Sequence, residues 1–400
     1  MGIAQSLYPA EYRVAKQKSR TIHVLIYLLN FNMVKIGELA GNVLNGSTFS
    51  IDATSDIRRT CNLSIVPTSA DFDISQGSNI WIDKYIQVLI GIEDTANNNN
   101  VVYTNMGIYL INNPSRTYNS SSNTLNISGI DMMAKLTGMR NGYLSGTQGG
   151  VEYQILHGTE IGDAIKETFA LGGFNTVILP SVYDNPFEPT SVVPNDIKIS
   201  IGSGTIYSIL KELVDINSFY QMYFDVNGIP HVDRIPSGDN EVIMVDDDLW
   251  SKVLIQYNKD ISFEEVKNTV EVYGKMSDEG VTPYAIAQDT DPNSPFNIYG
   301  TAGVLRIVLT GGEYDNIHSS ELAQDRADYE LYLRCRLQDQ ITITTVPIYW
   351  LDVNWLVEIT LPNKQGIEET AKYIIKKIDT TVGVEGTQTI NLIKYYPTDV

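Results

Sequence analysis

Cysteine is scarce in this sequence, and long apolar runs are missing. The two cysteines, Cys61 and Cys335, cannot build a disulfide framework, and no CxxC pair indicates a zinc or redox site. We expect Cys335 to be a buried free thiol on the apolar face of a helix. No apolar run is long enough to span a bilayer, so we expect no stable membrane insertion. The stretch before Arg20 has no apolar core, so we predict no secretory signal.

Basic residues are also few: 28 Lys and Arg stand against 48 Asp and Glu, and the formal net charge is −20 at pH 7. Binding to nucleic acid needs clustered Lys and Arg that contact phosphates. The acidic balance therefore argues against direct, sequence-specific nucleic-acid binding, and solubility is its simplest explanation.

Motifs that carry chemistry are missing as well. The HExxH of zinc enzymes and the GxSxG of hydrolases do not occur, and Gly202–Thr205 lacks the Gly-Lys of a phosphate-binding loop. The four histidines are far apart, at His23, His157, His231 and His318. The acidic stretches Asp246–Asp248 and Asp289–Asn293 do not match a calcium loop, so we expect solvated loops. We therefore predict no catalytic, cofactor-binding or metal-binding residue, no cofactor, and a protein that is not an enzyme.

Aromatic residues cluster at Tyr220–Phe224 and at Tyr349–Trp355, a pattern also found in sugar-binding proteins. Because these residues alternate with others along expected strands, we favour packing in a core. A glycosidase needs two carboxylates roughly 5–10 Å apart, and the sequence does not exclude such a pair.

Short runs of β-branched and aromatic residues predict a mainly β protein with α+β portions. Within 20–150, strands are expected at Thr21–Leu29, Thr48–Ile51, Cys61–Val66, Tyr85–Ile92, Val102–Asn112 and Thr124–Ile130, followed by a helix over Asp131–Leu136. Asn-rich turns separate them, including a hairpin tip at 97–100. Within 151–240, helices are expected after Thr159 and from Thr205 to Asp215. Asn227-Gly228 predicts a two-residue hairpin between strands at Phe219–Val226 and Ile229–Ile235.

The C-terminal part, 241–400, is again rich in expected strands. These lie at Lys267–Gly274, Leu305–Thr310, Ile341–Val346, Val353–Thr360, Ala371–Thr380 and Thr387–Tyr395. Ser277–Tyr299, rich in Asp, Pro, Asn and Ser, is expected to be an exposed loop. A helix begins at Ser319 or Ser320 and ends near Leu337, and its apolar face carries Ala323, Ala327, Leu331 and Cys335.

The segments ELAQDRADYELYLRCRLQDQITITTVPIYWLDVNWLVEITLP and KYIIKKIDTTVGVEGTQTINLI follow the order helix, then four strands. In this order they resemble the C-terminal half of phage baseplate hub proteins. Gly107–Ile111, then Asn126–Asp131 with its short helix, and KNTVEVYG at 267–274 match further elements of that family. Hub proteins are trimeric rings that join the tail tube to the central spike in contractile tails. The same fold occurs in related contractile injection systems and at the tips of non-contractile tails.

The resemblance implies two tail-tube-like β-barrel domains, at 20–150 and 241–400, with a small α/β connecting domain at 151–240. The helix at 319–337 is expected to pack against the second barrel. Three chains would form a pseudo-hexameric ring. Its partners would be the tail tube protein, a spike or tail-tip protein and other baseplate proteins. Such a ring belongs to the baseplate of a virion or of a phage-tail-like particle such as a tailocin, assembled in the bacterial host cytoplasm.

Residues 1–19 are expected to form an N-terminal arm, either a flexible tail or an extension that clasps a neighbouring chain. The sequence leaves open the roles of loops 97–100 and 277–299, and whether the tail contracts. Two alternatives to a hub remain. One is a hexameric distal tail ring protein, and the other is a cell-wall glycan-binding or glycan-hydrolysing tail-tip protein.

Overall fold

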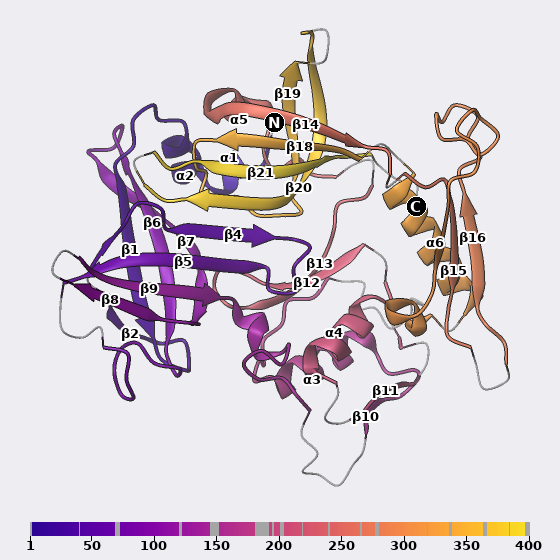
Figure 1. Cartoon of the computed structure of the whole chain (residues 1–400), viewed down its shortest axis with the longest axis horizontal. Helices are drawn as coiled ribbons and strands as arrows, with labels where there is room; N and C mark the ends of the chain where they lie inside the picture. Colours follow the sequence, from indigo (N-terminus) through magenta and orange to yellow (C-terminus); the bar gives the residue numbers. More distant parts are fainter. Residues whose placement is uncertain are drawn as a thin grey trace.

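The computed structural model describes residues 2–39, 41–68, 73–119, 122–144, 152–180, 192–193, 196–200, 204–217, 219–238, 241–264, 266–276, 280–317, 319–335, 338–362, 366–383 and 385–396. The chain is mainly β with a smaller share of helix, which confirms the fold class predicted from the sequence. Figure 1 shows a large β region at the left and top, a small α/β body below it, and a narrow unit at the right.

Most strands belong to one large sheet. Its N-terminal strands are β1 (Ile22–Leu29), β2 (Lys35–Glu38), β3 (Gly41–Val43), β4 (Thr48–Asp52), β5 (Arg59–Pro67), β6 (Tyr85–Asp94), β7 (Asn100–Ile111), β8 (Ser115–Asn119) and β9 (Ser122–Ile130). Its C-terminal strands are β14 (Leu254–Ser262), β18 (Gln338–Thr345), β19 (Leu356–Pro362), β20 (Glu368–Thr381) and β21 (Gln388–Lys394). They pair in the order β14-β18-β21-β20-β4-β5-β9-β7-β6-β1-β2, with β19, β3 and β8 attached beside this path.

The two β-rich parts of the chain are joined through β4 and β20. These strands pair antiparallel, with Ile51 opposite Ile378 and Phe49 opposite Thr380. Alternation within the strands buries one face, as on β5, where Cys61, Leu63 and Ile65 are buried. The two predicted barrel domains therefore meet in one continuous sheet. Their boundaries at 20–150 and 241–400 stay a prediction.

The connecting region is an α/β body whose core also includes Leu29, Tyr85 and Ile108 of the first β part. It contains β10 (Glu152–Ile155), α3 (Ile161–Leu171), β11 (Ile197–Ser200), α4 (Ile206–Val214), β12 (Tyr220–Phe224) and β13 (Pro230–Arg234), next to the 3-10 helix η2 (Met132–Lys135). Thr205 and Ser208 form a capping box that starts α4, and Ile209, Leu210 and Leu213 are buried as their spacing predicted. Residues 202 and 203 of the Gly202–Thr205 turn lie outside the described residues.

The hairpin predicted at Asn227-Gly228 is present, but its turn is longer than two residues. Phe224 pairs with Pro230, so the turn comprises the five residues between them. The Asp225 carboxylate accepts hydrogen bonds from the backbone amides of Asn227 and Ile229, each 2.9 Å away. These side-chain bonds stabilise a wider turn than the dipeptide alone predicts.

The unit at the right of Figure 1 corrects two expectations. It consists of β15 (Thr269–Tyr273), β16 (Tyr284–Gln288), β17 (Arg306–Leu309), the 3-10 helix η6 (Gly312–Asn316) and α6 (Ser320–Arg334). The helix packs on this three-stranded sheet and not against the large one, because Ala323 and Ala327 share a core with Ala285 and Ala287. Residues 277–299 were predicted to be a loop but contain β16, where the small Ala285 and Ala287 are buried and the larger Ile286 is exposed, so hydropathy did not indicate a strand. Residues 277–279, 336 and 337 lie outside the described part.

The N-terminal segment is folded onto its own chain, which corrects the predicted arm. It forms α1 (Ala4–Leu7) and α2 (Pro9–Ala15), and Ala4, Tyr12 and Ala15 are buried in the core of the second β part. Arg13 pairs with Asp94 of β6. The segment therefore lies across both β parts.

The acidic stretch at 246–248 also differs from the predicted solvated loop. Asp246 precedes α5 (Asp247–Val253). Its carboxylate accepts hydrogen bonds from the Gly2 amide at 2.9 Å and the Tyr12 hydroxyl at 3.2 Å. Partners far away in sequence thus hold this stretch in place.

Both cysteines are free, as predicted. Cys61 is buried, whereas Cys335 is only half-buried at the end of α6, where its thiol donates to Asp289 over 3.2 Å. In the described part of the chain, every helix is too short or too polar to cross a bilayer.

Candidate functional site

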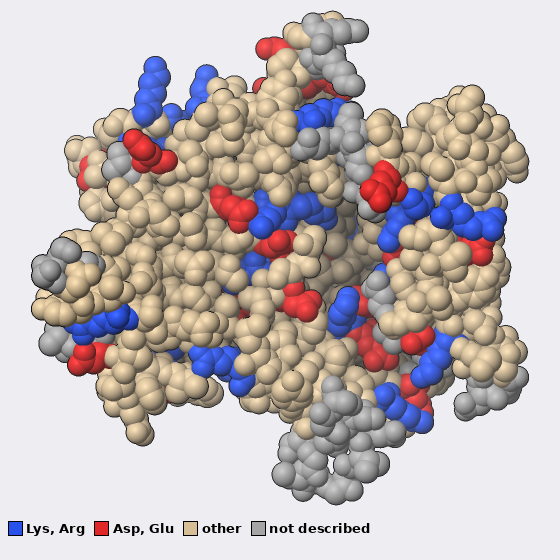
Figure 2. All heavy atoms as spheres, in the orientation of Figure 1, with Lys and Arg blue, Asp and Glu red and all other residues tan. Residues whose placement is uncertain are grey.

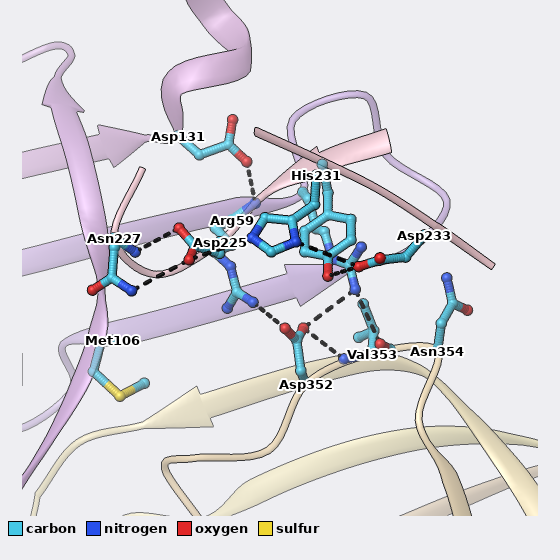
Figure 3. Close-up of polar contacts among 12 residues, drawn as sticks. Arg59, Met106, Asp131, Asp225, Asn227, His231, Asp233, Asp352, Val353 and Asn354 are labelled. Carbon is cyan, nitrogen blue, oxygen red and sulfur yellow. Dashed lines mark hydrogen bonds and ion pairs between the residues drawn. The ribbon is translucent and has the colours of Figure 1, made fainter. Parts of the chain in front are cut away.

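A buried polar cluster lies where the two β parts and the connecting body meet (Figure 3). Its centre is Asp352, in the loop between β18 and β19. The carboxylate pairs with Arg58 at 3.4 Å and with Arg59 at the start of β5. Both arginine side chains are almost fully buried, at 6% and 3% exposure. Burial by itself would raise the pKa of Asp352, but the two guanidinium groups lower it.

Arg58 also reaches the connecting body. It donates to the Val353 carbonyl and to the Gln221 side chain of β12, each over 3.0 Å. Its guanidinium lies 4.0 Å from the centre of the Tyr223 ring, a cation–π contact. Arg58, which belongs to the first β part, therefore contacts both the second β part and the connecting body.

Asp131 fixes the backbone of the same strand. Its carboxylate accepts from the Arg59 amide at 2.8 Å and the Met133 amide at 2.9 Å, so it links β5 to η2. Burial raises the pKa of Asp131 to about 6. The resemblance placed an Asp directly after the strand that is β9, and the structure shows that this residue, Asp131, connects β5 to η2.

His231 of β13 lies between two carboxylates. Asp225 and Asp233 are each 3.6 Å from a ring nitrogen, which is ion-pair distance rather than a hydrogen bond. These carboxylates raise the pKa of His231 to about 9. The ring stacks on Tyr223 at 5.2 Å, and the Tyr223 hydroxyl donates to Asp233 at 2.5 Å. His231 is therefore a charged member of the junction at neutral pH.

These contacts hold the two β parts and the connecting body together. Each carboxylate of the cluster is bound by a cation or by amide donors. Across the described residues, no group of three or more His, Cys, Asp or Glu side chains could hold a metal ion. His23 pairs with Glu93 at 2.8 Å, away from His231, and His318 lies outside the described part. The sequence-based statement that the chain has no catalytic, cofactor or metal residue stays a prediction.

Arg58, Arg59 and Asp352 were missed by the sequence reading. Two adjacent arginines at the start of an apolar strand were the available signal. Their partner, Asp352, lies 293 positions after Arg59 and 294 positions after Arg58. Local patterns do not report such a pairing.

Comparison with known proteins identifies the fold. A model of a domain of unknown function (DUF5048) matches residues 293–398, and no curated protein matches the sequence. The 43 kDa tail protein of prophage MuSo2 from Shewanella oneidensis aligns over 92% of this chain and 98% of its own, at 12% identity and a TM-score of 0.55. A tail protein from Neisseria meningitidis MC58 aligns over 93% and 96%, at 13% identity and a TM-score of 0.57.

A chain of the Francisella PdpA–VgrG complex aligns over 99% of this chain but 56% of its own, at 10% identity and a TM-score of 0.55. At these identities the likeness is one of fold. The chain has the fold of phage tail proteins, a fold shared with the PdpA–VgrG complex, and the resemblance read from the sequence is confirmed at this level.

Proposed function

We propose that this chain is a structural baseplate hub protein, which forms a trimeric, pseudo-hexameric ring between the tail tube and a spike or tail tip. The observation that carries the proposal is the extent of the fold match. The MuSo2 tail protein and this chain correspond over nearly their full lengths, including both β parts. Two β parts in one chain suit a threefold ring that must fit a sixfold tube.

The ends of the large sheet give this ring a physical basis. Among the described strands, β2 is the last strand at one end of the path and β14 the last at the other. An edge strand presents backbone donors and acceptors to another chain. Two different edges allow head-to-tail contacts, which close into a ring when the rotation fits.

The charge distribution is compatible with a structural role. On the face shown in Figure 2, basic and acidic side chains are interleaved, and no continuous basic band crosses the residues drawn there. With a net charge of −20, the protein is expected to contact the tube protein, spike and other baseplate proteins and not nucleic acid. We place it in the tail of a virion or tail-like particle assembled in the host cytoplasm, and we propose no enzymatic activity.

The test is the mass of the purified protein in solution by light scattering, with negative-stain images of the same sample. A threefold ring with a central hole is the expected result. A sixfold ring of single chains would favour a distal tail ring protein. Hydrolysis of purified cell wall by the same sample would overturn the structural proposal.

A further inference from the structure

Beside the polar junction lies a cavity of about 390 Å³, and Arg59, Tyr223, Asp225 and Asp352 of the junction form part of its lining. Its size falls within the range of small-molecule sites, roughly 300–1,000 Å³. The wall is built by Tyr8 with α2, by β4, β5, β7 and β12, by the β12–β13 turn and by the 349–355 loop. Figure 3 shows part of it, with Met106, Asp225, Asn227 and Asp352 facing the region between β7 and the loop.

One wall of the cavity is aromatic. The rings of Tyr8, Trp350 and Trp355 lie with centroids 5.4, 6.2 and 6.3 Å apart and planes within 19–38° of one another. Near-parallel rings at these separations are offset-stacked on one another, and together they line one side of the cavity. They do not surround a space from several sides, as a cation-binding box of rings would. Tyr8 and Trp355 are only partly buried, so part of this wall is accessible.

Polar groups adjoin this aromatic wall. Glu11 lines the cavity and makes no ion pair with any described residue. Burial, then the charges of Asp352 and Glu11, raise the pKa of Tyr8. The indole N–H of Trp350 is buried without a hydrogen-bond partner in the described part of the chain. This N–H has no exposed surface, so the polar group that this wall offers to a ligand is the carboxylate of Glu11.

We propose that this cavity binds a saccharide of one or two rings without anionic groups. The apolar C–H face of a sugar ring packs on an aromatic wall, and its hydroxyls need donors and acceptors at the edge. Trp355 and Tyr8 provide the wall, and Glu11 provides an acceptor. Glu11 in the lining, unpaired among the described residues, and the net charge of −20 disfavour phosphorylated or carboxylated sugars. This site is separate from the edges proposed for ring formation, so it stands or fails independently of them.

The experiment is a titration of the full chain, followed by tryptophan fluorescence and saturation-transfer NMR. The probes are glucose, maltose, galactose, lactose, N-acetylglucosamine and its β-1,4 dimer, taken into the millimolar range. We expect at least one to bind saturably. Trp355→Ala should weaken that binding about tenfold, the value of one lost stacking contact. Glu11→Gln, which keeps the fold and the side-chain size, should weaken it less.

The matched control is Tyr299→Ala, because Tyr299 is an aromatic residue that is 82% exposed and does not line the cavity. It should bind the sugar as the unmodified chain does. The proposal is overturned if none of the sugars binds, or if binding survives both cavity variants. N-acetyl-lysine methylamide is titrated in parallel. Binding of this compound without any sugar would assign the cavity to a basic side chain of a partner protein.

Discussion

At the scale of single residues, Asp352 has the largest structural role because it neutralises two buried guanidinium groups. Arg58 and Arg59 come from one β part and Asp352 from the other. A buried ion pair contributes little net stability when it is complete, but removing one partner leaves buried charge without compensation. The cost of losing Asp352 should therefore exceed that of losing an ordinary surface acid.

Asp352→Asn should lower the free energy of unfolding by about 3–5 kcal/mol, since both arginines then lose their counter-charge. Urea denaturation with a fluorescence readout measures this loss. Asp83→Asn is the matched control, because Asp83 pairs with Lys84 but is 53% exposed. It should change stability by less than about 1 kcal/mol. Equal effects of the two substitutions would contradict a special role for the buried cluster.

His231 should make stability depend on pH in the alkaline range. Its pKa in the folded protein is about 9, above the ordinary 6.5, so the folded state holds this proton more tightly. The resulting stabilisation is complete below about pH 6.5 and is lost as the pH rises through about 9. In His231→Gln, thermal melts between pH 6 and 10 should show a smaller decline. An unchanged decline would assign the effect to other groups.

At the scale of elements, the N-terminal helices and the unit of α6 are the parts that sequence patterns misplaced. Both are short of apolar residues, and both are held by contacts made elsewhere in the chain. In α6, Glu330 is buried and pairs with Arg326 at 3.0 Å and with Arg334, while the Tyr314 hydroxyl donates to it at 3.1 Å. Ion pairs and a hydrogen bond to Glu330, made by residues of the helix and of η6, thus take the place of a wide apolar face.

The N-terminal helices should be part of the cooperative fold. Ala4→Asp puts a charge at a fully buried position and should cost roughly 3 kcal/mol or more of unfolding free energy. Gln5→Asp introduces the same group one residue later, at an exposed position, and should be nearly neutral. Denaturation curves of the two variants decide the matter. If neither substitution changed the free energy of unfolding, residues 1–19 would be a dispensable arm after all.

The edge strand β14 should be needed for assembly. In an antiparallel pair, successive residues direct their amide toward and away from the partner strand. Of Gln256→Pro and Tyr257→Pro, one therefore loses a backbone bond to β18, and the other removes a backbone amide from the outer edge; each also removes one side-chain hydrogen bond. The variant that keeps its thermal stability should remain monomeric in light scattering. Ring formation by this stable variant would exclude β14 from the interface.

At the scale of the whole molecule, the net charge opposes the association of copies, whereas the edge strands of the sheet favour it. Every copy carries a net charge of −20, so copies repel, yet the sheet offers an open strand at each end of its path. Assembly of the proposed ring should therefore come from backbone pairing and apolar contact rather than from net electrostatic attraction.

Added salt should promote ring formation. The screening length falls from about 10 Å at 0.1 M to about 3 Å at 1 M, which weakens repulsion between copies. The assembled fraction in light scattering should rise between these concentrations. The proline variant that stays monomeric serves as the control and should respond weakly. A fall in assembly at high salt would indicate an interface held by ion pairs instead.

The sequence by itself determined what depends on local periodicity. Alternation along β1, β5, β6, β7 and β9 predicted these strands, and the spacing of Ile209, Leu210 and Leu213 predicted α4. The order of the C-terminal elements was enough to indicate the tail-protein fold. Such features follow from neighbouring residues, because a strand or helix repeats every few positions.

Only the tertiary structure decided how these elements meet. The joining of β4 to β20, the docking of α1 and α2, and the pairing of Arg58 and Arg59 with Asp352 connect positions hundreds of residues apart. Asp352 lies in the largely apolar stretch Tyr349–Trp355, and its neighbours in the sequence do not show which cations it contacts in space. Its burial and charge partners depend on how the chain closes on itself, which no local pattern records.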